Sequence, residues 1–91
     1  MPALIFRRVQ QVSIHTLRGC PFCVRALGLL DSKGAPYREI DVSEDRDERV
    51  RVSGRSGHKT FPQIYIGDVF IGGYEELRRL DESGRLDPML A

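Results

Sequence analysis

Apolar and polar residues alternate in two stretches of the first half of the chain. In residues 11–16, Val12 and Ile14 are separated by polar residues. The same alternation returns in residues 37–42. A period of two predicts strands, because successive side chains of a strand point to opposite faces of its sheet. We therefore expect one strand in each stretch.

Residues 21–33, which lie between these strands, carry the spacing of a helix. Val24, Leu27 and Leu30 recur at three-residue steps, and Gly34 supplies a natural C-terminal stop. Because a helix separates the two strands, a parallel pairing through a right-handed crossover is their natural connection.

A second helix, more charged than the first, is expected after the second strand. Ser43 is a residue type that favours the helix N-cap, and acidic residues follow it. Val50 and Val52 give this helix apolar positions, and Gly54 and Gly57 mark its end.

The last part of the chain predicts a hairpin and a third helix. Residues 61–66 and 69–71 are short apolar runs. Gly67 and Asp68 between them are typical of a two-residue turn, so these strands should be antiparallel. A helix over residues 74–82 follows. The order β-α-β-α-β-β-α predicts an α/β fold, with a four-stranded mixed sheet and helices on both faces.

The length and composition fit a single domain. The chain has 91 residues, of which 41% are hydrophobic and 30% are charged. These fractions are ordinary for a globular protein, and a second hydrophobic core would not fit in this length. We expect one domain over residues 1–91, with residues 1–9 as an N-terminal extension and a core at about residues 10–90.

The charge pattern argues against several classes of partner. The formal net charge is +1, and basic residues are interspersed with acidic ones, as in residues 45–49. Neither a nucleic-acid site nor an anionic-membrane site is indicated, and no apolar run reaches the length of a membrane span. Residues 1–8 lack the pattern of a signal peptide, so a cytoplasmic protein is expected.

Cys20 and Cys23 are the candidate reactive residues. In a reducing cytosol, such a pair is more often catalytic or metal-binding than a structural disulfide. Cys20 directly precedes the first expected helix, where free backbone N–H groups and the helix dipole favour a thiolate. Pro21 suits the first helical position, since its missing N–H would be unpaired there. Cys23 lies about one turn further inside the helix, so Cys20 is expected to attack and Cys23 to resolve the mixed disulfide.

Two other uses of this cysteine pair are open. A zinc site needs further ligands, and the sequence offers only His15 and His58 to complete a set of four nitrogen and sulfur ligands. We therefore expect no metal. A purely structural disulfide would close a very short loop, which gives little stabilisation.

Pro62 stands near the start of an expected strand, where proline is unusual. Two interpretations are open on the residues alone. The Phe61–Pro62 bond can be cis and deliberately placed. Alternatively, Pro62 can be an ordinary trans proline at a strand edge, which the local sequence favours.

Three motifs, in this order, resemble those of the glutaredoxin family. They are Cys20-Pro21-Phe22-Cys23, Thr60-Phe61-Pro62-Gln63-Ile64-Tyr65-Ile66, and Gly72-Gly73 with the acidic pair that follows it. The resemblance covers residues 11–90 and is greatest to bacterial dithiol members, including the closing residues 86–90. It implies a thioredoxin-like fold and a glutathione-dependent thiol–disulfide oxidoreductase that reduces protein disulfides and glutathione mixed disulfides.

The resemblance also implies roles for individual residues. Cys20 would be the nucleophile, and either Cys23 or a glutathione thiol would resolve the intermediate. Pro62 would be a cis proline facing the sulfurs, and the backbone of Phe61 would pair with the cysteine of glutathione as an added strand.

The γ-glutamyl end of glutathione would lie at the third helix. Gly73, Tyr74 and Glu75 would hold it, with N–H groups at the helix start receiving its carboxylate. Phe22 would form one wall of the groove, and Thr60 would lie beside it.

Three positions depart from the family pattern. Members usually have a lysine three residues before the nucleophile, whereas this chain has Leu17. We expect Arg18 to supply the missing positive charge near the nucleophile, and a solvated loop arginine is the alternative. Phe22 replaces the usual tyrosine, which loses a hydroxyl but keeps the groove wall. Tyr74 and Glu75 follow the glycine pair, where a small residue or cysteine and then Asp or Ser are usual.

Two other functions stand as alternatives. An iron–sulfur cluster carrier would hold a cluster between two protomers, but relatives that do so usually have Gly or Ser in place of Pro21. A thioredoxin-like redoxin would take electrons from a flavoenzyme instead of glutathione. The expected partners are glutathione and disulfide-containing or glutathionylated proteins, and the expected state is a monomer.

Overall fold

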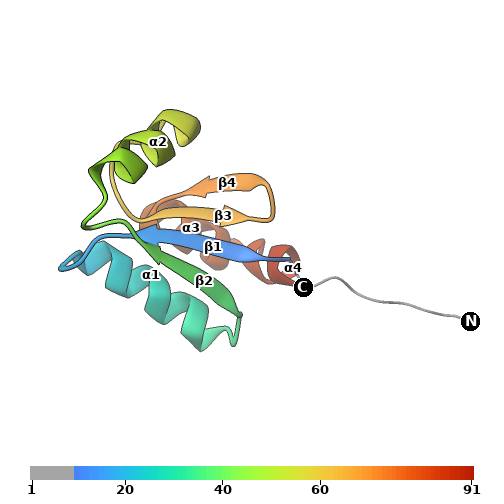
Figure 1. Cartoon of the computed structure of the whole chain (residues 1–91). Helices are drawn as coiled ribbons and strands as arrows, with labels where there is room; N and C mark the ends of the chain where they lie inside the picture. Colours follow the sequence, from blue (N-terminus) through green and yellow to red (C-terminus); the bar gives the residue numbers. More distant parts are fainter. Residues whose placement is uncertain (1–9) are drawn as a thin grey trace, which may run out of the picture.

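The computed structural model describes residues 10–91, and Figure 1 shows the path of the chain. The expected N-terminal extension, residues 1–9, lies outside the described residues. The elements, in chain order, are β1 (Val12–Thr16), α1 (Pro21–Ser32), β2 (Tyr37–Asp41), α2 (Arg46–Ser56), β3 (Gln63–Ile66), β4 (Val69–Gly72), α3 (Tyr74–Glu82) and α4 (Leu86–Leu90).

The strands form one mixed sheet in the order β2-β1-β3-β4. β1 and β2 are parallel, as expected for strands joined by a helical crossover. β3 runs antiparallel to both β1 and β4, and the turn between β3 and β4 places Gly67 at a φ of 59°. This left-handed conformation favours glycine, and it explains the residue type that marked the hairpin. The predicted four-stranded mixed sheet is confirmed.

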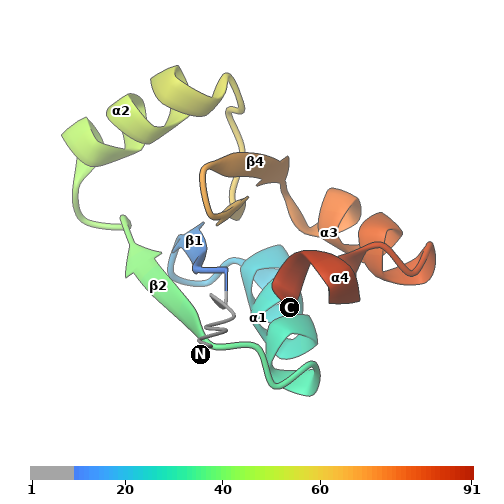
Figure 2. The ribbon, with the colours of Figure 1, turned by 90° about the vertical axis from the view of Figure 1, so that its right-hand side faces the viewer.

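Helices cover both faces of the sheet. Figure 2 shows α2 alone on one side of the strands, whereas α1, α3 and α4 share the other side. α1 packs against α3, and α3 packs against α4. The larger helical layer therefore holds the main core, and α2 forms a small second layer.

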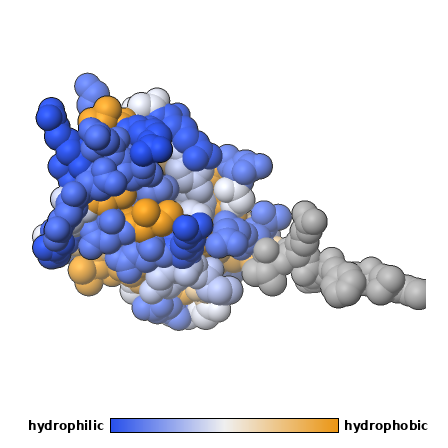
Figure 3. All heavy atoms as spheres, in the orientation of Figure 1, coloured by the Kyte–Doolittle hydropathy of each residue, from blue (hydrophilic) through white to orange (hydrophobic). Residues whose placement is uncertain are grey.

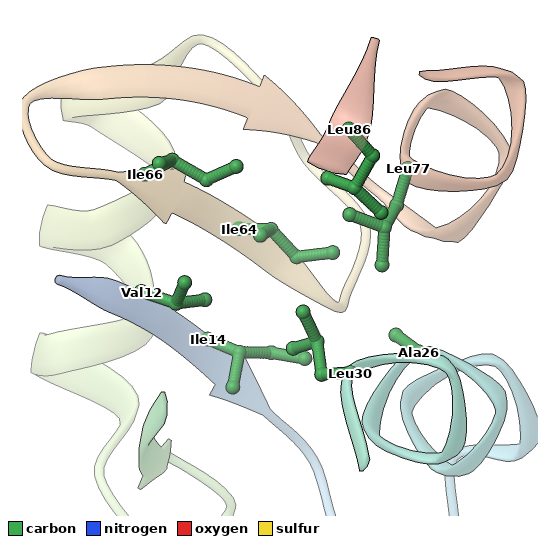
Figure 4. Close-up of a cluster of buried hydrophobic side chains, with 8 residues drawn as sticks. All are labelled: Val12, Ile14, Ala26, Leu30, Ile64, Ile66, Leu77 and Leu86. Atoms are coloured by element: carbon green, nitrogen blue, oxygen red, sulfur yellow. The ribbon is translucent and has the colours of Figure 1, made fainter. Parts of the chain in front are cut away.

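The core lies between the sheet and the larger helical layer. Its buried side chains are shown in Figure 4 and are Val12, Ile14, Ala26, Leu30, Ile64, Ile66, Leu77 and Leu86. α1 contributes Cys23, Ala26 and Leu30 to its buried face, whereas Val24 is 67% exposed. The buried stripe of α1 therefore follows the helical period of 3.6 and drifts away from a strict three-residue step.

α2 begins later than its sequence suggests. The expected N-cap at Ser43 is wrong, because Asp45 occupies the cap and its Oδ1 accepts the Glu48 N–H at 3.0 Å. The Ser43 hydroxyl instead accepts the backbone N–H of Arg18 at 2.6 Å. Ser43 thus fastens the loop after β2 to the loop that leads into α1. The end of α2 is as expected, with Gly57 in the left-handed conformation at the C-cap.

α4 is a short helix that the apolar spacing does not predict. It has five residues and includes a proline, so its sequence carries too little periodicity to mark a helix. Leu86 inserts into the core with no exposed surface, and the Lys33 ammonium pairs with Asp81 and with Asp87 across α1, α3 and α4. α4 therefore closes the end of the core between α1 and α3.

The face shown in Figure 3 is largely hydrophilic, with hydrophobic residues in small separate patches. Among residues 10–91, the large apolar side chains that are exposed are Phe22, Val24, Val50 and Val69. Within residues 10–91, no helix combines the length and the apolar character that crossing a membrane requires.

The position of Leu86 predicts a large effect of its truncation. Leu86→Ala should lower the free energy of unfolding by about 2–5 kcal/mol, because it removes buried methyl groups and leaves a cavity. Val24→Ala, at an exposed position of α1, is the matched control and should change stability by less than about 0.5 kcal/mol. Urea denaturation of both variants measures the difference. Equal effects would show that α4 does not close the core.

Candidate active site

Cys20 occupies the N-cap of α1, immediately before Pro21 at the first helical position. Its backbone is extended, with φ −94° and ψ 108°, and its Sγ accepts the Cys23 N–H at 3.2 Å. The side chain is half-buried. A sulfur in this position faces N–H groups that the helix itself leaves unpaired, so the helix start stabilises negative charge on Cys20.

Cys23 lies one turn further along α1 and is only 2% exposed. Burial raises the pKa of the Cys23 thiol to about 12, and the hydrogen bond with Cys20 adds to the rise. Both thiols are free. At neutral pH, Cys23 is therefore a protonated thiol beside the Cys20 sulfur and is shielded from solvent.

The Phe61–Pro62 peptide bond is cis. β3 begins only at Gln63, so Pro62 precedes the strand and does not interrupt its hydrogen bonds. The Cys20 thiol donates to the carbonyl oxygen of Phe61 at an Sγ–O distance of 3.6 Å. The backbone of Phe61 is therefore a hydrogen-bond partner of the Cys20 sulfur from outside α1.

A groove of about 320 Å³ begins beside this carbonyl and runs to the start of α3. It is lined by Phe22, His58, Thr60, Phe61, Pro62, Gly73, Tyr74, Glu75 and Glu76. The rings of Phe22 and Tyr74 face each other across α1 and α3, with centroids 6.3 Å apart. All seven residues that the sequence suggested for a substrate groove thus line one cleft.

The start of α3 contributes backbone donors to this groove. Gly73 is the N-cap, and the Glu76 carboxylate accepts the Gly73 N–H at 2.6 Å. The N–H groups of Tyr74 and Glu75 belong to the first turn, where a helix provides no carbonyl partners. These donors and the helix dipole favour an anion at this end of the groove.

Glu75 makes an ion pair on its own helix. Its Oε1 lies 2.8 Å from Nη2 of Arg78, and the hydrogen bond with this guanidinium lowers the pKa of the Glu75 carboxyl. Glu75 is therefore ionised at neutral pH, and Arg78 balances part of its charge. The Arg25 guanidinium lies over the ring of Phe22, 5.2 Å from its centroid, and adds positive potential outside the same wall.

Arg18 lies in the loop before Cys20. Its guanidinium forms an ion pair with Glu44, and both side chains are mostly exposed. This pair ties the loop before α1 to the segment before α2. The expected role of Arg18 as a charge partner of the nucleophile stays a prediction.

A second, wider groove of about 710 Å³ adjoins the first and shares Thr60 and Phe61 with it. The other residues that line it are Leu17, Arg49, Val50, Ser53 and Lys59. The Arg49 guanidinium donates to the carbonyls of Val42 and Ser43 at 2.8 and 2.6 Å, so its position is fixed. Arg49 and Lys59 therefore place two basic side chains in the groove that also contacts Phe61.

The side chain of Gln63 forms hydrogen bonds with residues that line both grooves. The sequence did not mark it as functional. Its side chain is fully buried and donates to the carbonyls of His58 at 2.7 Å and Thr60 at 3.2 Å. Its Oε1 accepts the Ser56 hydroxyl at 2.6 Å. A buried amide with such a set of bonds holds the loop before Pro62 in one conformation.

Comparison with known proteins decides the family. A family model described as Glutaredoxin matches residues 12–71. Glutaredoxin 1 of Rickettsia bellii is 43% identical over 83 residues, which cover 87% of this chain and 85% of that protein. The chain belongs to the glutaredoxin family.

Solved structures agree with this assignment. The solution structure of glutaredoxin from Brucella melitensis has a TM-score of 0.82 and 46% identity, and covers 90% of this chain and 89% of its own. A buckwheat glutaredoxin crystallised in complex with glutathione has a TM-score of 0.83 and 27% identity, covering 89% and 76% of the two chains. This glutaredoxin has the thioredoxin-like fold, and its family is one of thiol–disulfide oxidoreductases.

The different environments of the two cysteines in this glutaredoxin predict different reactivities. At pH 8, iodoacetamide should label Cys20 and spare Cys23, since a pKa of about 12 keeps the buried Cys23 thiol protonated. Labelling of Cys23 should rise with pH towards 12, because the thiolate is the reactive form. Peptide mass spectrometry measures both sites.

Denatured protein, in which both cysteines should be labelled at pH 8, is the control for this experiment. Labelling of Cys23 in the folded protein as fast as Cys20 would contradict the burial described above.

Proposed function

We propose that this glutaredoxin reduces protein disulfides and glutathione mixed disulfides, with glutathione as the reductant. The observation that carries the proposal is the continuity of the groove. Tyr74 and Glu75 at the start of α3 line the same groove as Phe61, and the Phe61 carbonyl oxygen lies 3.6 Å from the Cys20 sulfur. The buckwheat relative in complex with glutathione supports the choice of ligand.

Glutathione fits this groove in one direction. Its γ-glutamyl carboxylate would lie at the N–H groups of the α3 start, and its ammonium would lie near the Glu75 carboxylate. The cysteinyl residue would pair with the backbone of Phe61 as a short added strand, which brings its sulfur to Cys20. Phe22 would cover the side of the ligand as an apolar wall.

The glycyl end of glutathione would then point past Phe61 into the second groove. Lys59 and Arg49 line that groove and supply positive charge for the glycyl carboxylate. Leu17, which replaces the lysine usual in the family, makes this end of the site more apolar. The glycyl end would therefore depend on the side of the groove that follows α2.

In the first chemical step, the Cys20 thiolate attacks the glutathione sulfur of a glutathionylated protein. A bond forms between the two sulfurs, the original disulfide breaks, and the protein thiolate leaves and takes a proton from solvent. The product is a mixed disulfide between Cys20 and glutathione. The helix start and the Phe61 backbone hold the reacting sulfurs in place.

Two second steps regenerate the enzyme. In one, the thiolate of a second glutathione attacks the bound glutathione sulfur, so that glutathione disulfide leaves and Cys20 is again a thiolate. For a protein disulfide, Cys20 first attacks one sulfur, so that a mixed disulfide with the protein forms and the first protein thiolate leaves. Cys23 then attacks the Cys20 sulfur, and its proton goes to the second protein thiolate, which is released. Two glutathione molecules then reduce the Cys20–Cys23 disulfide and become glutathione disulfide.

This chemistry needs a reducing pool of glutathione, which supports a cytoplasmic location, and we propose that the protein acts as a monomer. Within residues 10–91, there is no group of three or more His, Cys, Asp and Glu side chains arranged to hold a metal ion.

The assignment of roles predicts opposite outcomes for the two cysteines. Cys20→Ser should lower glutathione-dependent reduction of a small mixed disulfide by more than about 1,000-fold, because it removes the nucleophile. Cys23→Ser should keep most of this activity, since glutathione can resolve the intermediate. The assay couples glutathione disulfide formation to glutathione reductase, and a protein disulfide serves as the second substrate.

Loss of activity in both variants on the mixed disulfide would contradict the division of roles. An inactive wild type with both thiols free would contradict the proposed function and would favour a flavoenzyme reductant or a cluster-binding role.

A further inference from the structure

His58 lines the groove between the cis proline and α3, and the mechanism above does not use it. On the basis of the proposed function, we propose that His58 binds the γ-glutamyl α-carboxylate of the substrate. It would thereby select disulfides of glutathione over disulfides of smaller thiols. The argument rests on where the imidazole lies, how it is held and which charges share the groove with it.

The imidazole lies beside the start of α3. A Cβ atom placed on Gly73 would meet the carbonyl oxygen of Pro62 at 3.4 Å, Oε1 of Glu76 at 3.5 Å and Nε2 of His58 at 3.6 Å. Gly73 is the N-cap of α3, so Nε2 is next to the turn that presents unpaired N–H groups. An anion at that turn would have the imidazole on its other side.

Several contacts hold His58 in this position. The backbone N–H of His58 donates to the Ser56 hydroxyl at 3.0 Å. Its backbone carbonyl accepts from the buried Gln63 side chain at 2.7 Å. Its ring packs edge-on against Phe70, with centroids 5.5 Å apart, and Nε2 lies 3.2 Å from the hydroxyl of Thr60. The imidazole is therefore ordered before a ligand arrives, which reduces the entropy lost on binding.

The charges of the groove give His58 its significance. Among the described residues that line it, Glu75 and Glu76 are acidic, and His58 is the only side chain that can carry a positive charge. The Glu76 carboxylate is committed to the Gly73 N–H and Glu75 to Arg78. A substrate carboxylate needs donors here, and a histidine N–H supplies one whether the ring is neutral or charged.

Binding would rearrange one hydrogen bond. In the free protein, Nε2 and the Thr60 hydroxyl are partners. With a carboxylate at the α3 turn, the Nε2–H and the Thr60 O–H can both donate to its oxygens, since each group has a donor to offer. The carboxylate would then be held by side chains from the loop before β3 and by backbone from α3.

The test compares two substrates that differ only at the proposed contact. One is a peptide carrying a disulfide to glutathione, and the other carries the same tripeptide without its α-carboxylate, 4-aminobutanoyl-cysteinyl-glycine. Single-turnover rate constants are measured by mass spectrometry with the reduced protein. His58→Ala should lower the second-order rate constant for the glutathione substrate roughly 10-fold, as expected for a hydrogen bond to a charged group. It should leave the rate on the truncated substrate unchanged.

Two further variants serve as controls. His58→Gln keeps an N–H donor near the position of Nε2 and should recover most of the lost rate. His15→Gln makes the same change at the other histidine, whose ring packs on Tyr65 with centroids 6.3 Å apart and does not line the groove. It should leave the preference between the two substrates unchanged, and thermal unfolding verifies that each variant is folded.

The outcomes separate this inference from the proposed function. Equal rate losses on both substrates in His58→Ala would show a structural role and overturn the inference, while the proposed function would stand. No rate loss on either substrate would overturn it as well. A wild type unable to reduce the glutathionylated peptide would overturn both proposals.

Discussion

The antiparallel register of β1 and β3 is the constraint on which the site depends. His15 pairs with Gln63, so the end of β1 lies beside the beginning of β3. The chain that leaves β1 reaches Cys20 within one loop, and the chain that enters β3 has just passed Phe61 and Pro62. A slip of one residue would turn every side chain of a strand to the other face of the sheet. It would therefore remove the contact between the Cys20 sulfur and the Phe61 carbonyl.

The burial of one face of α1 gives the two thiols different roles. The residue at the N-cap stays partly exposed and faces unpaired N–H groups, whereas Cys23 turns into the core with Leu30. Burial keeps Cys23 protonated, and the negative charge of the Cys20 sulfur adds to this effect until that sulfur enters a disulfide. The order of attack and resolution thus follows from helix geometry.

The sequence predicted the sheet and the three longer helices because their signals are local: alternation, helical spacing and turn residues. It also brought the groove residues together through motifs shared with a family. α4 and the cap of α2 were missed, since Leu86 and Asp45 depend on packing and loop geometry that no short pattern encodes. For the same reason, His58 was not marked as a groove residue, and Gln63 was not marked as the side chain that holds the loop beside the groove. Their roles arise from a hydrogen-bond network between segments, and a lone histidine or glutamine carries no such information.

The most direct test of this account is NMR spectroscopy of the trapped intermediate, a Cys23→Ser protein linked through Cys20 to isotopically labelled glutathione. The account predicts nuclear Overhauser effects from the γ-glutamyl protons to the amides of Tyr74 and Glu75, and a cysteinyl amide protected by the Phe61 carbonyl. Contacts of the γ-glutamyl group with Leu17 or Val50 would show the opposite direction of binding and would contradict the account.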